Sequence, residues 1–146
     1  MMEYLEGVKK AKTLEIGELL VQAEGTEVKV NGAVHTIRDM GNVAFVILRK
    51  RDGLVQCVFE EGVTAFELKE LKEASAVEVL GTIRKEERAA HGIEIRLKEI
   101  KVLSEPDEPL PLPISKWKLN TSLEAKLNMR PISLRNVRER AKFKIQ

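Results

Sequence analysis

Hydrophobic and polar residues alternate over residues 27–39, EVKVNGAVHTIRD. Val28, Val30 and Val34 fall on one side of this pattern, and mostly polar residues fall on the other. A period of two is typical of a strand with one buried face, so we predict a first strand here. Gly32 in its middle indicates a bend or the close approach of another backbone.

Two further apolar runs, residues 43–49 and 54–59, flank the polar stretch RKRDG and predict a β-hairpin. The hairpin has two candidate turns. If it closes over Lys50-Arg51, Phe45 stands directly opposite Gln56, whereas Asp52-Gly53 is a competing turn signal. The pattern of residues does not choose between these registers.

The rest of the pattern predicts a weak helix over residues 14–24 that stops at Gly25, a short helix over residues 61–73, and strands over residues 76–84 and 93–103. Three strands, a helix and two strands follow the order of an OB-fold. An open α+β sandwich would show the same order. We favour the all-β alternative, a five-stranded Greek-key OB-fold barrel with a helix between strands 3 and 4. Closing the sheet removes exposed strand edges.

The composition changes after residue 103. Residues 104–122 contain four prolines and predict a stiff, extended linker. Residues 123–146 look helical again from about Asn136, and the chain ends within an apolar-patterned segment. We therefore expect an OB domain over residues 1–103, a proline-rich linker over residues 104–122, and the truncated start of a second domain over residues 123–146.

Length and composition narrow the class of protein. The chain has 146 residues, 43% of them hydrophobic, which is enough for one domain with a core. No apolar run approaches the roughly 20 residues that cross a bilayer, and the N-terminal residues lack the pattern of a secretory signal. The single cysteine, Cys57, excludes an internal disulfide and a cysteine-based zinc cluster. We expect a cytoplasmic protein that does not bind membranes.

The net charge of +2 conceals locally basic segments. Residues 116–144 are clearly basic, and the hairpin region holds Arg38, Arg49, Lys50 and Arg51 against Asp39 alone. The distribution of charge, rather than its sum, indicates where an acidic partner would bind. A solvated face is the ordinary interpretation of any one such cluster.

Parity along the predicted hairpin places an aromatic ring on its outer face. Arg49 is costly to bury unpaired, so we expect the set of residues that it shares with Phe45 to face outward. The uniformly apolar set that includes Val55 and Cys57 belongs inside, so Gln56 faces outward as well.

Glu94 falls on the outer side of the last predicted strand, and a barrel could bring it near Phe45 and Gln56. An aromatic ring stacks on a nucleic-acid base with about 1–3 kcal/mol, while an amide and a carboxylate can bond the edge of that base. Phosphates would be held by Arg38, Arg49 and Arg51. The alternative is that Phe45 belongs to the core and that the polar residues are ordinary solvated ones.

Neither histidine supports a metal site. His35, in the first strand, is expected to be structural, and His91 is expected to be solvated in the loop before Gly92. No glycine-rich phosphate loop or nucleophile motif occurs, so no catalytic residue is assigned.

Two stretches carry a resemblance to a known family. Residues 27–59, EVKVNGAVHTIRDMGNVAFVILRKRDGLVQCVF, resemble the anticodon-binding OB domain of class II (subclass b) aspartyl-tRNA synthetases of the archaeal and eukaryotic-like type. The tail, LEAKLNMRPISLRN and then AKFKIQ, is similar to the segment that opens the catalytic domain in that family, commonly written R-L-D-N-R-x-x-D-L-R. The resemblance runs from about Ile16 to Gln146.

The resemblance implies a role for each outward residue. In that family a Phe on the second strand stacks on the central uridine of the anticodon, and Phe45 matches it. A Gln on the third strand bonds that base and a Glu on the fifth strand completes the reading; Gln56 and Glu94 match these two. Arg38 is a looser match to a basic residue near the anticodon backbone.

Two residues depart from the family pattern. Ala33 stands where many relatives have Trp, which removes a stacking or packing group and bears on how neighbouring anticodon bases are held. Met129 stands where Asp is common in the tail segment.

The resemblance further implies that the chain is the N-terminal part of an aspartate–tRNA ligase, a homodimer that uses ATP and magnesium to charge tRNA. The chain itself would bind the anticodon stem-loop as a monomer, with no cofactor and no catalysis of its own. An asparaginyl-tRNA synthetase or a paralogue is the nearest alternative. A stand-alone OB module for single-stranded nucleic acid is a second, which the similarity of the tail disfavours.

Overall fold

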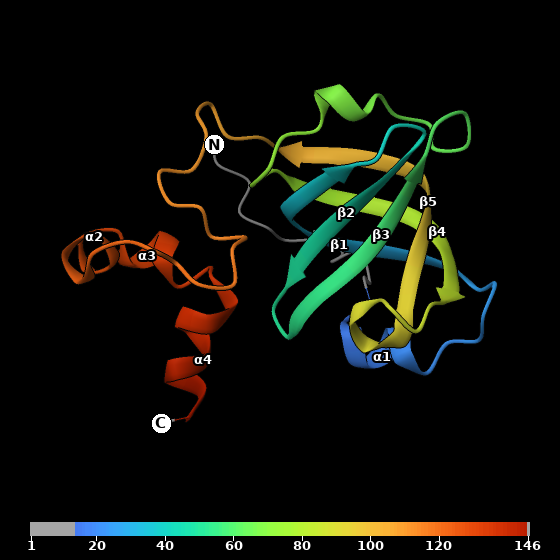
Figure 1. The fold of residues 1–146 in the computed structure, drawn as a ribbon. Helices are drawn as coiled ribbons and strands as arrows, with labels where there is room; N and C mark the ends of the chain where they lie inside the picture. The colour runs from blue at the N-terminus through green and yellow to red at the C-terminus, as the bar shows by residue number, and fades with distance from the viewer. Residues whose placement is uncertain (1–13, 146) are drawn as a thin grey trace, which may run out of the picture.

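The computed structural model describes residues 14–145, and a closed five-stranded barrel is their main feature (Figure 1). The strands are β1 (Glu27–Asp39), β2 (Val43–Lys50), β3 (Gly53–Glu60), β4 (Ala76–Lys85) and β5 (Ile93–Ser104). The α-helices are α1 (Ile16–Leu20), α2 (Leu123–Asn128), α3 (Arg130–Ser133) and α4 (Val137–Ile145). Two 3₁₀ turns, η1 (Leu68–Glu70) and η2 (Ala90–Gly92), lie before β4 and β5.

The strand order around the barrel is β1-β2-β3-β5-β4, and β3 pairs with β5 in parallel. This order confirms the predicted OB-fold. The long strand β1 bends and pairs with both β2 and β4. Ala33 pairs with Arg49 of β2 and with Ala76 of β4, beside an irregularity between Val34 and Thr36. The close approach predicted at Gly32 is present, since a Cβ there would lie 3.1 Å from the carbonyl oxygen of Arg49.

Strict alternation along β2 separates the core from the outer face. Ala44, Val46 and Leu48 are buried, whereas Phe45 and Ile47 between them are half-buried. Helix α1, near one end of the barrel, buries two of its apolar side chains in the same core. The strand faces inferred from parity are therefore those of the folded chain.

The segment between β3 and β4 differs from the predicted helix over residues 61–73, because it contains a single 3₁₀ turn, η1. The backbone N–H of Ala65 donates to the carbonyl of Lys98 on β5, 2.8 Å away. That bond draws the segment alongside β5 and takes away a donor that a helix would use. Phe66, Leu68 and Leu71 then pack against the barrel core although this segment forms no α-helix.

The β2–β3 hairpin uses neither of the two candidate turns. Lys50 pairs with Gly53 across a two-residue turn, so Phe45 lies opposite Val58, and Gln56 lies opposite Ile47. The two side chains are diagonal neighbours on the outer face rather than a directly opposed pair. The turn is also tied to α1, since the Asp52 carboxylate accepts a hydrogen bond of 3.1 Å from the Ile16 N–H.

A small second core holds the segment after β5 together. Leu112, Ile114 and Leu119 are buried there, and Asn136 joins them to α4. The Asn136 amide donates to the carbonyls of Ile114 at 2.8 Å and Lys116 at 2.7 Å, while its oxygen accepts from the N–H of Glu139 and so caps the helix. Helix α4 begins next to the predicted start at Asn136.

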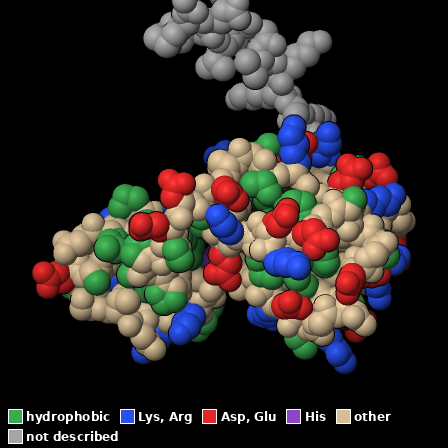
Figure 2. Space-filling model, turned by 90° about the horizontal axis from the view of Figure 1, so that it is seen from above, with side chains coloured by type: hydrophobic (Ala, Val, Ile, Leu, Met, Phe, Trp, Pro, Cys, Tyr) green, Lys and Arg blue, Asp and Glu red, His purple; other side chains and the backbone are tan. Residues whose placement is uncertain are grey.

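Several large hydrophobic side chains of the C-terminal helices are exposed, including Leu123, Leu127 and Phe143. Figure 2 shows hydrophobic side chains gathered on the left-hand lobe, where the linker and these helices lie, and charges of both signs interspersed over the barrel. Within residues 14–145, no helix combines the length and the apolar character needed to cross a membrane.

Candidate nucleic-acid interface

The outer face of β2, β3 and β5 brings three of the predicted site residues together. Phe45 lies on β2, Gln56 lies on β3, and Glu94 lies on β5 directly beside Gln56 in the parallel register. The Gln56 Nε2 group donates a hydrogen bond of 3.0 Å to Glu94 Oε2. The parallel pairing of β3 with β5 is what joins residues so distant in the sequence.

Glu94 is 4% exposed although it is a carboxylate on an outer face. It has two polar partners. Gln56 donates to one oxygen, and Arg84 of β4 places its Nε 3.5 Å from the other. Because a buried carboxylate needs such partners, Arg84 and Gln56 together hold Glu94 in one orientation.

A hollow of about 420 Å³ opens over these side chains. Four of the six predicted site residues line it, namely Arg38, Phe45, Gln56 and Glu94. Its other lining residues are Val43, Val58, Glu60, Arg84, Glu86 and Arg88. An aromatic ring, an amide, three carboxylates and three arginines line this hollow. Such groups can stack a planar base, bond its edge and hold phosphate.

Sequence reasoning missed Arg84, Glu86 and Arg88 as members of this site. These residues lie at the end of β4 and in the loop to β5. The signal that could have found them is topological, because the loop between the fourth and fifth strands is one of the loops with which OB-folds bind oligonucleotides.

Arg49 and Arg51 lie at the other end of the hairpin and do not line this hollow. Arg49 shares the outer face of β2 with Phe45, and its Nη1 lies 3.4 Å from His35 Nδ1. Burial, and then the positive charges of Arg135 and Arg140, lower the pKa of Arg49. Arg51 is exposed in the turn.

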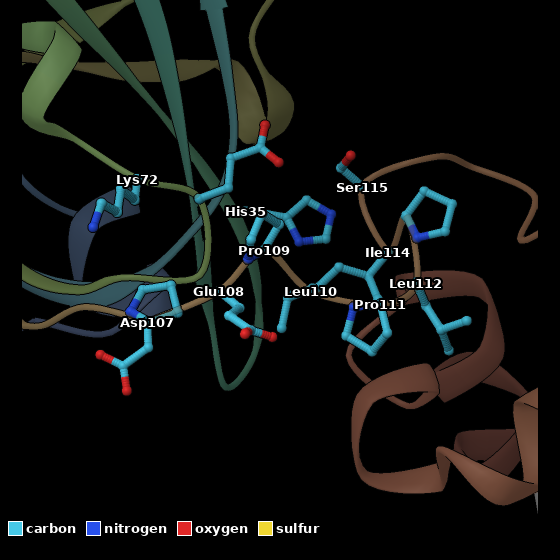
Figure 3. A pocket seen from close by; sticks show the side chains of 13 residues that line it. His35, Lys72, Asp107, Glu108, Pro109, Leu110, Pro111, Leu112, Ile114 and Ser115 are labelled. Carbon is cyan, nitrogen blue, oxygen red and sulfur yellow. The ribbon is translucent and has the colours of Figure 1, made fainter.

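His35 is buried in β1, as expected of a structural histidine, and burial followed by the charge of Arg49 lowers its pKa. Figure 3 shows the ring in a cavity of about 650 Å³ between the barrel and the proline-rich segment, with Leu110, Leu112 and Ile114 among its lining residues. This cavity is lined by different residues from the hollow beside Phe45.

Cys57 is buried in the barrel, and burial raises its pKa to about 12. It is a core residue rather than a nucleophile. Among residues 14–145, no group of three or more His, Cys, Asp or Glu side chains is arranged to hold a metal ion.

Comparison with known proteins agrees with this geometry. The sequence profile of OB-fold nucleic acid binding domains matches residues 28–103, which include β2 and β3 and all but the ends of β1 and β5. The chain therefore belongs to the family of OB-fold nucleic acid binding domains.

Three individual proteins show what kind of OB-fold protein this chain resembles. The chain is 37% identical over 129 residues to the aspartate–tRNA(Asp/Asn) ligase of Archaeoglobus fulgidus, which covers 86% of this chain and 30% of the ligase. The asparaginyl-tRNA synthetase of Pyrococcus horikoshii, complexed with asparaginyl-adenylate, superposes with a TM-score of 0.71 at 26% identity, over 86% of this chain and 29% of that one. The aspartyl-tRNA synthetase of Entamoeba histolytica shows the same fold, with a TM-score of 0.74 at 23% identity, over 86% of this chain and 33% of that one.

These comparisons confirm the predicted resemblance to the aspartyl-tRNA synthetases. The chain spans about 30% of the length of the curated ligases that it matches.

Proposed function

We propose that this chain binds the anticodon loop of a tRNA and that the hollow on its outer barrel face reads the central base. The observation that carries the proposal is the hydrogen-bonded pair of Gln56 and Glu94 in the same hollow as the Phe45 ring. Membership of a nucleic-acid-binding family and similarity to proteins named as tRNA ligases support RNA as the partner. Phe45 would stack on the base, at about 1–3 kcal/mol.

The pair favours uridine over cytidine through the orientation of the Gln56 amide. Glu94 accepts one N–H of that amide, so the other N–H and the carbonyl oxygen are left for a base. Uracil presents a carbonyl oxygen, which can accept the remaining Gln56 N–H, and an N3–H, which can donate to Gln56 Oε1. Cytosine presents an amino donor and a bare N3 in their place, and matching it requires an amide flip that turns Gln56 Oε1 against the Glu94 carboxylate.

The positive residues at the rim of the hollow, Arg38, Arg84 and Arg88, would hold the backbone on either side of the base. Arg84 would also orient the Glu94 carboxylate, which it contacts. Ala33 lies in the middle of β1, pairs with Arg49 and does not line the hollow, so its departure from the family pattern would leave the central base untouched.

For the longer protein we propose an aspartate–tRNA ligase that depends on ATP and magnesium, acts in the cytoplasm and is a homodimer. The similarity to ligases of which this chain spans about 30% supports the ligase. In that protein residues 1–103 would form the anticodon-binding domain, residues 104–122 a linker, and residues 123–146 the opening segment of the catalytic domain. The second small core is formed by Leu112, Ile114 and Leu119 of the proposed linker together with Ile132, so this part of the linker packs with the C-terminal segment.

An asparaginyl-tRNA synthetase is the second candidate, favoured by the superposition on the enzyme from Pyrococcus horikoshii. A stand-alone single-strand-binding module is a third, and the similarity of residues beyond 103 to tRNA ligases disfavours it. The downstream reading frame separates a ligase from a stand-alone module, since ATP-site motifs after residue 146 indicate a ligase.

The experiment is a titration of the chain with anticodon stem-loops that carry uridine or cytidine at the centre, at one moderate salt concentration. We expect the wild-type chain to prefer uridine and Phe45→Ala to lose about 1–3 kcal/mol of binding. Ile47→Ala is the matched control, because Ile47 is a half-buried outer residue of the same strand that does not line the hollow. Equal binding of both loops, with Phe45→Ala no weaker than Ile47→Ala, would overturn the proposal.

A further inference from the structure

Three arginines from two distant parts of the chain meet at the end of the hairpin opposite the base-reading hollow. Arg49 of β2, Arg135 before α4 and Arg140 of α4 line one narrow pocket of about 90 Å³. We call them the arginine cluster. Lys144, one turn further along α4, lines the same pocket.

The charges of the arginine cluster are not compensated. Within residues 14–145, no carboxylate lies within 4 Å of any of the three guanidinium groups. The nearby acid of α4, Glu139, is already bonded to Lys126 and Lys142. Burial, and then the charges of Arg135 and Arg140, lower the pKa of Arg49. Like charges gathered in this way disfavour one another until an anion binds between them.

The position of the arginine cluster relative to Phe45 bears on which anion would bind between these arginines. Arg49 and Phe45 lie on the same face of β2, four residues apart, which is about 13 Å at about 3.3 Å per residue. An RNA strand whose base is stacked on Phe45 can therefore present a backbone phosphate to the cluster.

We propose that Arg49, Arg135 and Arg140 form a binding site for one phosphodiester of the RNA strand whose base is stacked on Phe45. This inference rests on the proposed function. The phosphate would be held by the barrel and by the C-terminal helix at once. The two parts already touch there, because Arg140 Nη2 donates a hydrogen bond of 2.8 Å to the carbonyl of Arg51 in the hairpin turn.

The first test measures how the affinity for a uridine-centred stem-loop depends on salt. Each phosphate contact contributes about 0.7–0.9 to the slope of log K against log salt. We expect the double variant R135Q/R140Q to lose about one such contact, so its affinity falls about threefold less than that of the wild type between about 50 and 200 mM salt. Arg49 is left in place because it is half-buried against His35.

The matched control is R138Q. Arg138 lies on the same helix, is exposed, and does not line the pocket, so R138Q removes one positive charge of α4 outside the cluster, against two removed by R135Q/R140Q. Retention of the wild-type salt slope by R138Q supports a localised site. An equal change for R138Q on its own would show a diffuse charge effect and would overturn the proposal. Helix content measured by circular dichroism verifies that each variant is folded.

The second test places the phosphate. Stem-loops are prepared with a single neutral methylphosphonate at each backbone position in turn. We expect the wild-type chain to lose affinity at one backbone position away from the central base, and R135Q/R140Q to be insensitive at that same position. The site is overturned if the two proteins respond identically at every position, whatever other partner the cluster binds. The preference for a central uridine and its loss in Phe45→Ala report the proposed function separately, so either idea can fail alone.

Discussion

Gln56 of β3 donates a hydrogen bond of 3.0 Å to Glu94 of β5, and the two residues are direct neighbours in the one parallel strand pair of the described barrel. In the proposed function, this contact orients the amide that reads the base. It sets which atoms of the amide are presented to a ligand. The predictions for base specificity follow from it.

Substitution Glu94→Gln is expected to remove the discrimination between uridine and cytidine at the central position. An amide at residue 94 can donate as well as accept, so both orientations of the Gln56 amide become acceptable. Binding of the cytidine loop should strengthen by about 1–3 kcal/mol, the range for one bidentate base contact, while binding of the uridine loop changes little. Titration of both loops measures the ratio.

Glu60→Gln is the control for that substitution, because Glu60 lines the same hollow but bonds Arg96 instead of Gln56. It should keep the preference for uridine. A Glu94→Gln chain that still discriminates as the wild type does would show that Glu94 does not orient the amide.

Arg84 is expected to act on specificity through Glu94. Arg84→Ala removes the partner 3.5 Å from Glu94 Oε1, so the ratio of uridine to cytidine binding should fall, and Arg84→Lys should restore part of it. In an E94Q background, Arg84→Ala should leave the ratio unchanged, since the carboxylate that it orients is gone. If Arg84→Ala weakens both loops equally in either background, the arginine is a phosphate contact alone.

Gly81 is expected to be required for the packing of β4 on β5. A Cβ at this position would collide with the carbonyl oxygen of Arg96 and with the Ile95 side chain. Gly81→Ala should therefore lower the free energy of unfolding by about 1–3 kcal/mol, the range for overpacking. Urea denaturation measures the loss.

Gly17→Ala is the comparison, because no atom lies within 4 Å of a Cβ added at Gly17 in α1. It should leave stability unchanged or raise it by about 0.5–1 kcal/mol through helix propensity. Equal effects of the two substitutions would mean that β4 and β5 can separate without cost at Gly81.

His35 is expected to make stability depend on pH. Its pKa in the folded chain is lowered from about 6.5 by burial and then by the charge of Arg49. The unfolded chain therefore binds a proton more readily, so this contribution to stability is complete above about pH 6.5 and is lost as the pH falls from there through the folded pKa.

The measurement is the urea midpoint as the pH is lowered from about 7.5 to about 5, on either side of the ordinary histidine pKa. The midpoint of the wild type should fall more steeply than that of His35→Gln. His91→Asn, at an exposed histidine in η2, should behave as the wild type does. Parallel curves for His35→Gln and the wild type would contradict the prediction.

Two expectations from the sequence differ from the folded chain because long-range bonds intervene. The spacing of Phe66, Leu68 and Leu71 is typical of a helix, but the N–H of Ala65 donates to a carbonyl of β5. Those side chains therefore cover the barrel from a segment that is not α-helical. The hairpin turn was ambiguous because its polar residues suit several registers. The core positions Ala44 to Leu48 and the bond from Ile16 to Asp52 select the one observed.

The sequence by itself determined which residues of each strand face outward, because the side-chain period of a strand is local and needs no knowledge of its partners. It therefore placed Phe45, Gln56 and Glu94 on the outer side before any pairing was known, and its order of elements indicated the barrel. Only the tertiary structure decided that Gln56 and Glu94 are bonded to each other, that Arg84 joins them, and that Arg49 meets Arg135 and Arg140 instead of the base-reading hollow. Those contacts join residues far apart in the chain, and they exist only once the closure of the barrel and the docking of α4 have set the distances between segments.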